Sequence, residues 1–330
     1  SRTKDPDGVD ISTGSVGLGA VAPIFGALSQ RFVQDHFDAG EDGHYISLLG
    51  DAELDEGSVW EAIAEPAMRD LSNVIWVVDL NRQSLDRVIP GIRVQAWRTM
   101  FEANGWNVID AKYGKKMQAR FAEPSGELLR TAIDEMSNEV YQRLLRVSPS
   151  RLREWLPTPS RYSGDLSRLI NRWDDDELQE AFHNLGGHDF AMLREALAAA
   201  GGEGGPHVVF AYTLKGWRLP SVGDPQNHSV TLSGEQMELL RQQLDIPEDE
   251  VWSAPDEDTA AGRLCVETDT HLRDEEHPDT SPPGISIPHE LGHPYRGSMS
   301  TQQVFGLVLT GVSREVPDVA GRIVTVSPDV

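Results

Sequence analysis

A strand–helix–strand pattern constrains the fold more than any other feature of this chain. Residues 45–50 are short and apolar and end in Gly-Asp, and residues 74–80 (VIWVVDL) are rich in β-branched side chains, so both predict buried strands. Residues 53–70 begin with acidic side chains and carry apolar ones at helical spacing, which predicts a helix. We therefore expect an α/β domain, a parallel sheet flanked by helices, with Asp51 and Asn81 at the sheet edge where such folds bind ligands.

Asp51 and Asn81 carry oxygen atoms that suit a hard divalent cation. Mg²⁺ takes about six oxygen ligands and usually only one or two carboxylates, the others coming from carbonyls, water and phosphate. The Asp51 carboxylate, the Asn81 amide oxygen and the backbone carbonyl of Gln83 are the expected metal ligands. A diphosphate would complete the shell from the amino end of the helix predicted to begin at Glu53, because free N–H groups and the helix dipole favour anions there.

Composition argues against several classes of partner. The net charge is −24 and no large Lys/Arg cluster is present, so we expect no nucleic acid partner. No apolar run approaches the roughly 20 residues that span a bilayer, and no signal peptide is visible, so we expect no membrane partner. The single cysteine, Cys265, rules out an internal disulfide and is typical of a reducing, cytoplasmic compartment. The chain starts without Met and reads as an excerpt of a longer protein.

A glycine-rich turn precedes the strand–helix–strand unit and leads into an amphipathic helix predicted over residues 18–33. Its glycines allow backbone to approach a flat ligand closely. The sequence Thr-Gly-x-Val-Gly-x-Gly of residues 13–19 resembles the Thr-Gly-Pro-Leu-Gly-x-Gly turn of transketolases and the Val-Ser-Met-Gly-Leu-Gly turn of homodimeric pyruvate dehydrogenases. In those families the backbone at the positions matching Gly14 and Val16 contacts the aminopyrimidine of thiamine diphosphate.

Further motifs follow the same order as in the homodimeric-type pyruvate dehydrogenase first (decarboxylating) component, a member of the thiamine diphosphate-dependent transketolase-like superfamily. Asp-Ala-Glu-Leu-Asp-Glu resembles that family's Asp-Gly-Glu-Met-Asp-Glu, and Asn-Arg-Gln-Ser-Leu-Asp resembles its Asn-Leu-Gln-Arg-Leu-Asp. The resemblance is collinear over most of residues 12–250. The segments that carry it are 51–56, 81–86, 105–109, 186–189 and 212–216.

The resemblance implies thiamine diphosphate and Mg²⁺ as cofactors. It implies decarboxylation of a 2-oxo acid, pyruvate above all, with reductive acetylation of a lipoyl group, which is the reaction of a pyruvate dehydrogenase (acetyl-transferring) oxidoreductase. It also implies a homodimer with the active site at the interface, and a lipoyl-bearing acetyltransferase component of a multienzyme complex as partner. Two alternatives stay open: transketolase-type transfer of two-carbon ketol units between sugar phosphates, and a non-enzymatic binding module.

The resemblance also assigns residue roles. Gly50, Ala52 and Glu53 join Asp51 in the cofactor-binding set. Ala52 replaces the second Gly of the family's Gly-Asp-Gly, at a cost of about 1 kcal/mol if the backbone there needs a positive φ.

Four residues have predicted catalytic roles. Glu56 and Glu61 match glutamates that face the dimer interface in transketolases and help to link two active sites. Lys215 and His228 match a lysine and a histidine near the reacting centre, and an imidazole with a pKa near neutrality can shuttle protons there. The loop between them is about two residues shorter than the family pattern.

The predicted domains are residues 1–250, a diphosphate-type domain; 251–297, a linker; and 298–330, the start of a pyrimidine-type domain. By resemblance, Asp329 would fall near the cofactor pyrimidine. The activating glutamate of the family would lie beyond Val330, so we expect no turnover by this chain alone.

Finer secondary structure is predicted as follows. Residues 127–145 form one helix, residues 148–176 are an excursion over the surface, and a helix over 190–200 is capped by Asp189. A linker without periodicity covers residues 247–288, helices cover 233–244 and 299–312, and a strand begins at 321–326.

One motif points to a different function. His289-Glu290-Leu291-Gly292-His293 satisfies the zinc metallopeptidase signature His-Glu-x-x-His, and Glu315 lies at a plausible third-ligand distance. That signature needs both imidazoles on one helix, whereas proline follows the second histidine directly. A zinc metallopeptidase is therefore the remote alternative.

Overall fold

The computed structural model describes two compact units, Ser1–Trp252 and Ser253–Val330. Within them the described residues are 13–37, 43–84, 87–88, 94–202, 204–248, 254–273, 284–290 and 295–325.

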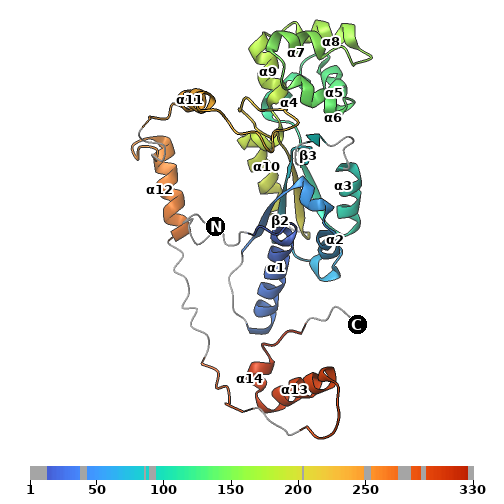
Figure 1. Ribbon diagram of the computed structural model, residues 1–330, viewed down its shortest axis with the longest axis vertical. Coiled ribbons are helices and arrows are strands. Elements are labelled where there is room, and N and C mark those ends of the chain that lie inside the picture. The colour runs from blue at the N-terminus through green and yellow to red at the C-terminus, as the bar shows by residue number, and fades with distance from the viewer. Residues whose placement is uncertain are drawn as a thin grey trace. The chain divides into compact units, whose positions relative to one another are not determined.

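The first unit is built on a parallel sheet of four strands (Figure 1). The strand order is β1 (Tyr45–Gly50), β2 (Val74–Leu80), β6 (His207–Tyr212), β5 (Asn107–Ala111). Each strand is the kind of apolar run that a sheet covered on both faces requires. Gly50 pairs with Asp79 and Leu80 with Tyr212, so the strands end at the same edge. The predicted α/β class and both predicted strands of the strand–helix–strand unit are confirmed.

Helices cover both faces of this sheet. On one face lie α1 (Leu18–Phe37), α2 (Gly57–Ile63) and α3 (Val94–Ala103), and on the other lies α10 (Phe190–Ala200) (Figure 1). The first face holds the aromatic centre of the core, with ring centroids 4.8–6.0 Å apart. Its members are Trp76, Phe101, Trp106 and Phe210. The second face is thinner, because Ala196 and Ala200 bring α10 close to Val209.

The helix predicted over residues 53–70 is wrong in its extent. The chain forms a 3₁₀ turn, η2 (Asp51–Asp55), before α2, and a second one, η3 (Pro66–Met68), after it. Pro66 has no N–H to donate, and this ends the regular helix while fitting the first position of η3. The apolar spacing is kept across all three pieces, since Val59, Ile63 and Met68 are buried.

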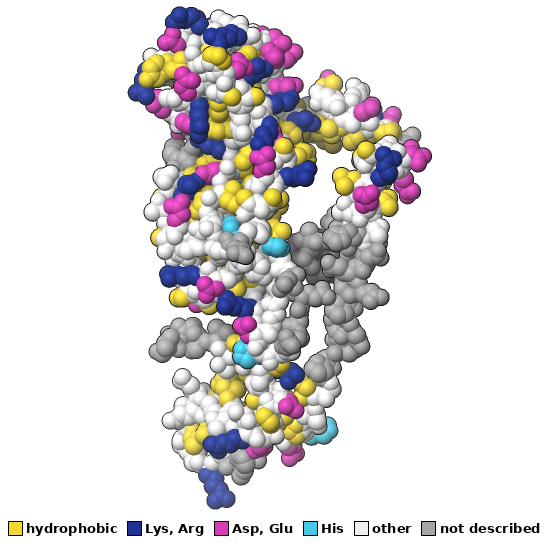
Figure 2. All heavy atoms as spheres, turned by 180° about the vertical axis from the view of Figure 1, so that it is seen from behind, with side chains coloured by type: hydrophobic (Ala, Val, Ile, Leu, Met, Phe, Trp, Pro, Cys, Tyr) yellow, Lys and Arg dark blue, Asp and Glu magenta, His cyan; other side chains and the backbone are white. Residues whose placement is uncertain are grey.

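Beyond the carboxyl edge of the sheet lies a group of short helices. They are α4 (Lys115–Phe121), α5 (Gly126–Asp134), α6 (Asn138–Leu144), α7 (Pro149–Trp155), α8 (Ser163–Ile170) and α9 (Asp175–His183). The single helix expected over 127–145 is wrong, because the Ser137 side chain accepts from Val140 N and caps a new helix. On the face shown in Figure 2, acidic and basic side chains are interspersed over this group.

The surface excursion expected over residues 148–176 is also wrong. Leu152, Leu156, Leu166 and Ile170 are all almost fully buried, so α7 and α8 belong to the core. The capping carboxylate of Asp174 then starts α9 by accepting from Glu177 N at 2.7 Å. Polar composition misled the prediction, because each helix is only two turns long and buries one narrow stripe.

Three smaller elements complete the first unit. They are the short antiparallel pair β3 (Gln83–Ser84) and β4 (Arg87–Val88), the 3₁₀ turn η4 (Gly186–His188), and α11 (Gly234–Gln243). Asp189 caps α10 and Ser233 caps α11, as predicted.

The second unit contains α12 (Ala260–Arg273), α13 (Thr301–Glu315) and α14 (Pro317–Ala320). The prediction of a linker without periodicity over 247–288 is therefore wrong for the residues of α12. The helix predicted over 299–312 is confirmed as α13. The strand expected at 321–326 is wrong for residues 321–325, which follow α14 as a turn and extended chain. Among the described helices, none combines the length and the apolar character that crossing a bilayer requires.

Candidate functional site

Asp51 and Asn81 directly follow β1 and β2, and their side chains bond to neighbouring backbone N–H groups. The Arg82 N–H, which directly follows Asn81, donates to Oδ2 of Asp51 at 2.9 Å. The next N–H, that of Gln83, donates to Oδ1 of Asn81 at 2.9 Å. The Asp51 carboxylate and the Asn81 amide oxygen therefore accept from consecutive N–H groups, those of Arg82 and Gln83, at this edge of the sheet.

Asp51 is buried, and this makes its negative charge costly. Burial is the largest influence and raises the pKa of the Asp51 carboxyl to about 6, the N–H of Arg82 opposes the shift, and the carboxylate of Asp79 adds to it. A divalent cation at Asp51 would relieve both the lost hydration and the repulsion by Asp79. The donor set therefore fits Mg²⁺, which accepts one carboxylate, amide and carbonyl oxygens, and phosphate.

A second layer of buried polar side chains holds this edge from below. The Gln83 side chain is buried, and its Nε2 donates to Oε1 of Gln142 at 3.0 Å. Gln142 Nε2 in turn donates to the backbone oxygen of Asn81 at 3.5 Å, and Asn138 Nδ2 donates to that of Arg82 at 3.1 Å. Sequence reasoning missed Asn138 and Gln142, whose burial follows from the separate helix α6 and not from the single helix that was predicted.

The glycine-rich turn is tied to the strand tip by Glu53. The Glu53 carboxylate accepts from the N–H of Gly17 at 3.1 Å and from the N–H of Gly50 at 3.3 Å. A Cβ added to Gly14 or to Gly50 would meet no protein atom within 4 Å, so both have space for a ligand beside the backbone. Val16, between the two glycines of the turn, is 56% exposed.

Ala52 lies in η2 without backbone strain. The non-glycine residues with positive φ in the described chain are Arg82, Ser125, Arg218 and Asp245, so the replacement of glycine by Ala52 has no conformational cost of that kind. The Ala52 side chain is exposed. Ala52 does not have the positive φ that would have made the replacement costly.

Lys215 and His228 also come together. Lys215 Nζ lies 3.2 Å from Nδ1 of His228, although 12 residues separate them in the loop after β6. Asn227 Nδ2 donates to the backbone oxygen of Lys215 at 2.6 Å and fixes the two ends of this loop.

His188 anchors the start of the same loop. Its Nε2 accepts from the N–H of Leu214 at 2.7 Å, and its ring stacks on Trp217 with centroids 4.4 Å apart. Burial lowers the pKa of His188; the Asp79 carboxylate opposes this shift and the Arg218 guanidinium adds to it. These contacts give His188 a structural role at the start of the loop.

The remaining predicted residues belong to α2, its N-cap included, or to the second unit. Glu56 and Glu61 are exposed at the start and in the middle of α2. Asp329 and His293 lie outside the described residues, and His289 and Glu290 lie in a segment without helix, contrary to what a His-Glu-x-x-His site needs. Within the described part of the chain, no three His, Cys, Asp or Glu side chains form a metal-binding group. The Asp51 site differs from such a group, because its three candidate oxygen donors are one carboxylate, one amide and one backbone carbonyl.

Comparison with known proteins agrees with this geometry. Residues 2–123 match the family model described as transketolase, thiamine diphosphate binding domain. The matched residues include the glycine-rich turn, Asp51, Asn81 and Gln83, so this part of the chain is similar to a thiamine diphosphate-binding domain of the transketolase type.

The individual relatives include several pyruvate dehydrogenase E1 components. The chain is 28% identical over 250 residues to the pyruvate dehydrogenase E1 component of Cupriavidus necator, covering 73% of this chain and 27% of that protein. It is 27% identical over 253 residues to the E1 component of Pseudomonas aeruginosa, covering 73% and 28%. A transketolase structure from Campylobacter jejuni shares the fold, with a TM-score of 0.50, 18% identity, and coverage of 93% of this chain and 39% of that one. The chain thus spans little more than a quarter of the length of these curated relatives.

Proposed function

We propose that this chain is the diphosphate-binding part of an enzyme that decarboxylates a 2-oxo acid, pyruvate first among them, and passes the two-carbon unit to a lipoyl group on a partner protein. One observation carries the proposal. At the ends of β1 and β2, side-chain oxygens of Asp51 and Asn81 accept hydrogen bonds from two consecutive backbone N–H groups. The collinear likeness to pyruvate dehydrogenase E1 components supports the choice of reaction.

Asp51, Asn81 and the Gln83 carbonyl would hold Mg²⁺, and the metal would hold the diphosphate of the cofactor. The open sides of Gly14 and Gly50 leave backbone accessible to it. When bound, thiamine diphosphate supplies an electron sink that lets the carboxylate of a 2-oxo acid leave as CO₂.

The loop after β6 would serve the substrate. The Lys215 ammonium beside the His228 ring offers a positive charge to the substrate carboxylate. His228 would exchange a proton with the substrate carbonyl oxygen, since an imidazole ring can both donate and accept a proton. Glu56 and Glu61, exposed on α2, would face a second copy of the chain in a homodimer.

Binding is the first test. Calorimetric titration of the 330-residue chain with thiamine diphosphate should give measurable affinity in Mg²⁺ and a loss of at least tenfold when EDTA replaces the metal. Thiamine, which lacks the diphosphate, is the control ligand and should bind at least tenfold more weakly. Equal affinity for thiamine and its diphosphate would contradict the proposed site.

Turnover is the second test. The gene product that contains this chain should release CO₂ from pyruvate in a manner that depends on thiamine diphosphate. Transketolase-type ketol transfer is the second candidate, favoured by the family match of residues 2–123. Xylulose 5-phosphate with ribose 5-phosphate tests it under the same conditions. Turnover of the sugar phosphates without CO₂ release from pyruvate would replace the first reaction with the second.

A further inference from the structure

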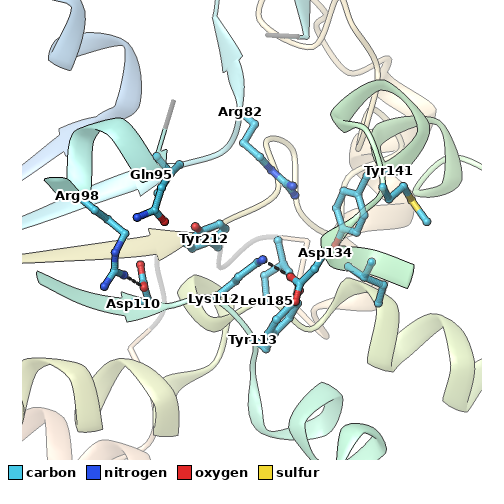
Figure 3. Close-up of a pocket in the computed structure, with 13 residues that line it drawn as sticks. Arg82, Gln95, Arg98, Asp110, Lys112, Tyr113, Asp134, Tyr141, Leu185 and Tyr212 are labelled. Atoms are coloured by element: carbon cyan, nitrogen blue, oxygen red, sulfur yellow. Dashed lines mark hydrogen bonds and ion pairs between the residues drawn. The ribbon is translucent and has the colours of Figure 1, made fainter. Parts of the chain in front are cut away.

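A cavity of about 520 Å³ lies beside the strand-edge site (Figure 3). Its floor comes from the ends of β5 and β6, its sides come from α3, α5 and α6, and Arg82 enters it from the end of β2. Apolar and aromatic side chains form much of the lining, namely Val94, Tyr113, Ile133, Tyr141, Leu185 and Tyr212. Apolar walls with a few polar groups are typical of small-molecule sites.

Two of the three cations in this cavity have carboxylate partners. Arg98 pairs with Asp110, and Lys112 pairs with Asp134. Asp134 is further occupied, because the Tyr113 hydroxyl donates to it at 2.5 Å.

Arg82 is the third cation, and in the described part of the chain no carboxylate lies within ion-pair distance of it. Its Nε is buried without a hydrogen-bond partner, and its guanidinium carbon lies 4.5 Å from the centre of the Tyr141 ring. Figure 3 shows the guanidinium pointing into the space bordered by Tyr141, Lys112 and Tyr212. Among the described residues, the cavity therefore contains one positive charge without a carboxylate partner.

The backbone of Arg82 is fixed in a costly conformation. Its φ is 62°, in the left-handed region, which costs a non-glycine residue about 1–2 kcal/mol. Two contacts hold the residue there, from its N–H to Asp51 and from Asn138 to its carbonyl oxygen. These contacts fix the point from which the Arg82 side chain enters the cavity.

We propose that this cavity is a second small-molecule site, which binds an organic monocarboxylate with an apolar or aryl body. The planar guanidinium of Arg82 matches a carboxylate in two parallel hydrogen bonds, and the apolar walls enclose the remainder of the ligand. One unpaired cation balances one negative charge, whereas a phosphate dianion needs more donors than Arg82 offers. The proposal goes beyond the decarboxylase reaction and does not depend on bound cofactor.

Phenylacetate tests the proposal on the unaltered 330-residue chain without cofactor. Titration followed by NMR should show phenylacetate binding at least tenfold more tightly than phenylacetamide, its neutral isostere, and inorganic phosphate at equal concentration should not compete. Intermolecular NOEs between the phenyl ring and the methyl group of Met136, which lines the cavity, should locate the ligand. Equal affinity for the amide, or no NOE to Met136, would overturn the proposal.

A matched pair of variants isolates the guanidinium. Arg218 has the same φ of 62°, and its guanidinium carbon also lies 4.5 Å from an aromatic ring, that of Trp217, outside this cavity. Arg82→Met should lower phenylacetate affinity at least tenfold and leave that of phenylacetamide unchanged, while Arg218→Met should change neither. Equal losses in the two variants would count against the site.

Discussion

The two halves of the candidate site are held by different means. At the tips of β1 and β2, Asp51 and Gln83 are buried, and the buried Gln142 bonds the Gln83 side chain and the Asn81 backbone. In the loop after β6, Lys215 and His228 meet at the surface and depend on the loop itself for their position. The comparison teaches that the predicted metal site is built into the edge of the sheet, whereas the predicted proton-transfer pair is held by contacts within one surface loop.

The largest effect should come from the buried half. Asp51→Asn keeps the shape of the side chain but removes the charge, so affinity for thiamine diphosphate with Mg²⁺ should fall by more than about 100-fold, or about 2.7 kcal/mol. Calorimetric titration of the 330-residue chain measures it. Asp70→Asn, at an exposed turn before β2, is the matched control and should bind as the parent does.

The surface half should affect rate rather than binding. His228→Gln in the gene product should lower kcat for pyruvate by about 100-fold, the order expected for loss of one general acid–base group, while affinity for the cofactor stays constant. Steady-state kinetics and calorimetry separate the two quantities. A fall in cofactor affinity as large as that of Asp51→Asn would remove the distinction between the halves.

The support beneath the strand tips should appear as stability. Gln142→Leu leaves the buried Nε2 of Gln83 without its acceptor, which should lower the free energy of unfolding by about 1–3 kcal/mol. Urea denaturation followed by tryptophan fluorescence measures it. Gln95→Leu, exposed on α3, is the control and should lie within about 0.5 kcal/mol of the parent.

Acid should loosen the loop half first. The ring of His188 accepts from Leu214 N–H only when it is neutral, and burial lowers its pKa below the ordinary value of 6.5. His188 therefore binds a proton more readily in the open loop than in the closed loop. The hydrogen bond thus stabilises the closed loop fully above pH 6.5, and this stabilisation is lost as the pH falls below that value.

Hydrogen exchange measures this smallest effect. After correction for the intrinsic rate, protection of the Leu214 amide should be lower at pH 5 than at pH 7.5, because the protonated ring of His188 cannot accept its hydrogen bond. The buried Leu152 amide donates to the backbone oxygen of Ser148, and neither residue titrates, so its protection is the internal reference. Parallel loss at both amides would indicate general unfolding instead of loop opening.

The sequence predicted the strand-edge residues because they depend on local patterns. Each strand is one apolar run, and Asp51 and Asn81 follow directly after their strands, so parallel pairing alone places them together. Gln142 could not be assigned in the same way, because its partner Gln83 is 59 residues distant and both are ordinary polar residues in sequence. Contacts between distant polar side chains have no periodic signature.

The errors in the fold have a common physical origin. Residues 148–176 form two-turn helices, too short for a periodic pattern to exceed the polar composition around them, and only their burial identifies them. The break at Ser137 was missed for the opposite reason, because apolar residues continue across it while the serine side chain starts a new helix. Capping was decisive there and periodicity was not.

Glu53 gives the glycine-rich turn and the tip of β1 a common fastening. One carboxylate accepts from Gly17 and Gly50, whose positions in the chain are 33 residues apart. A molecule gripped at one end by the turn and at the other by the strand would therefore meet two surfaces whose separation is already set. The distance between these two surfaces, which Glu53 fixes, would then select ligands of matching length.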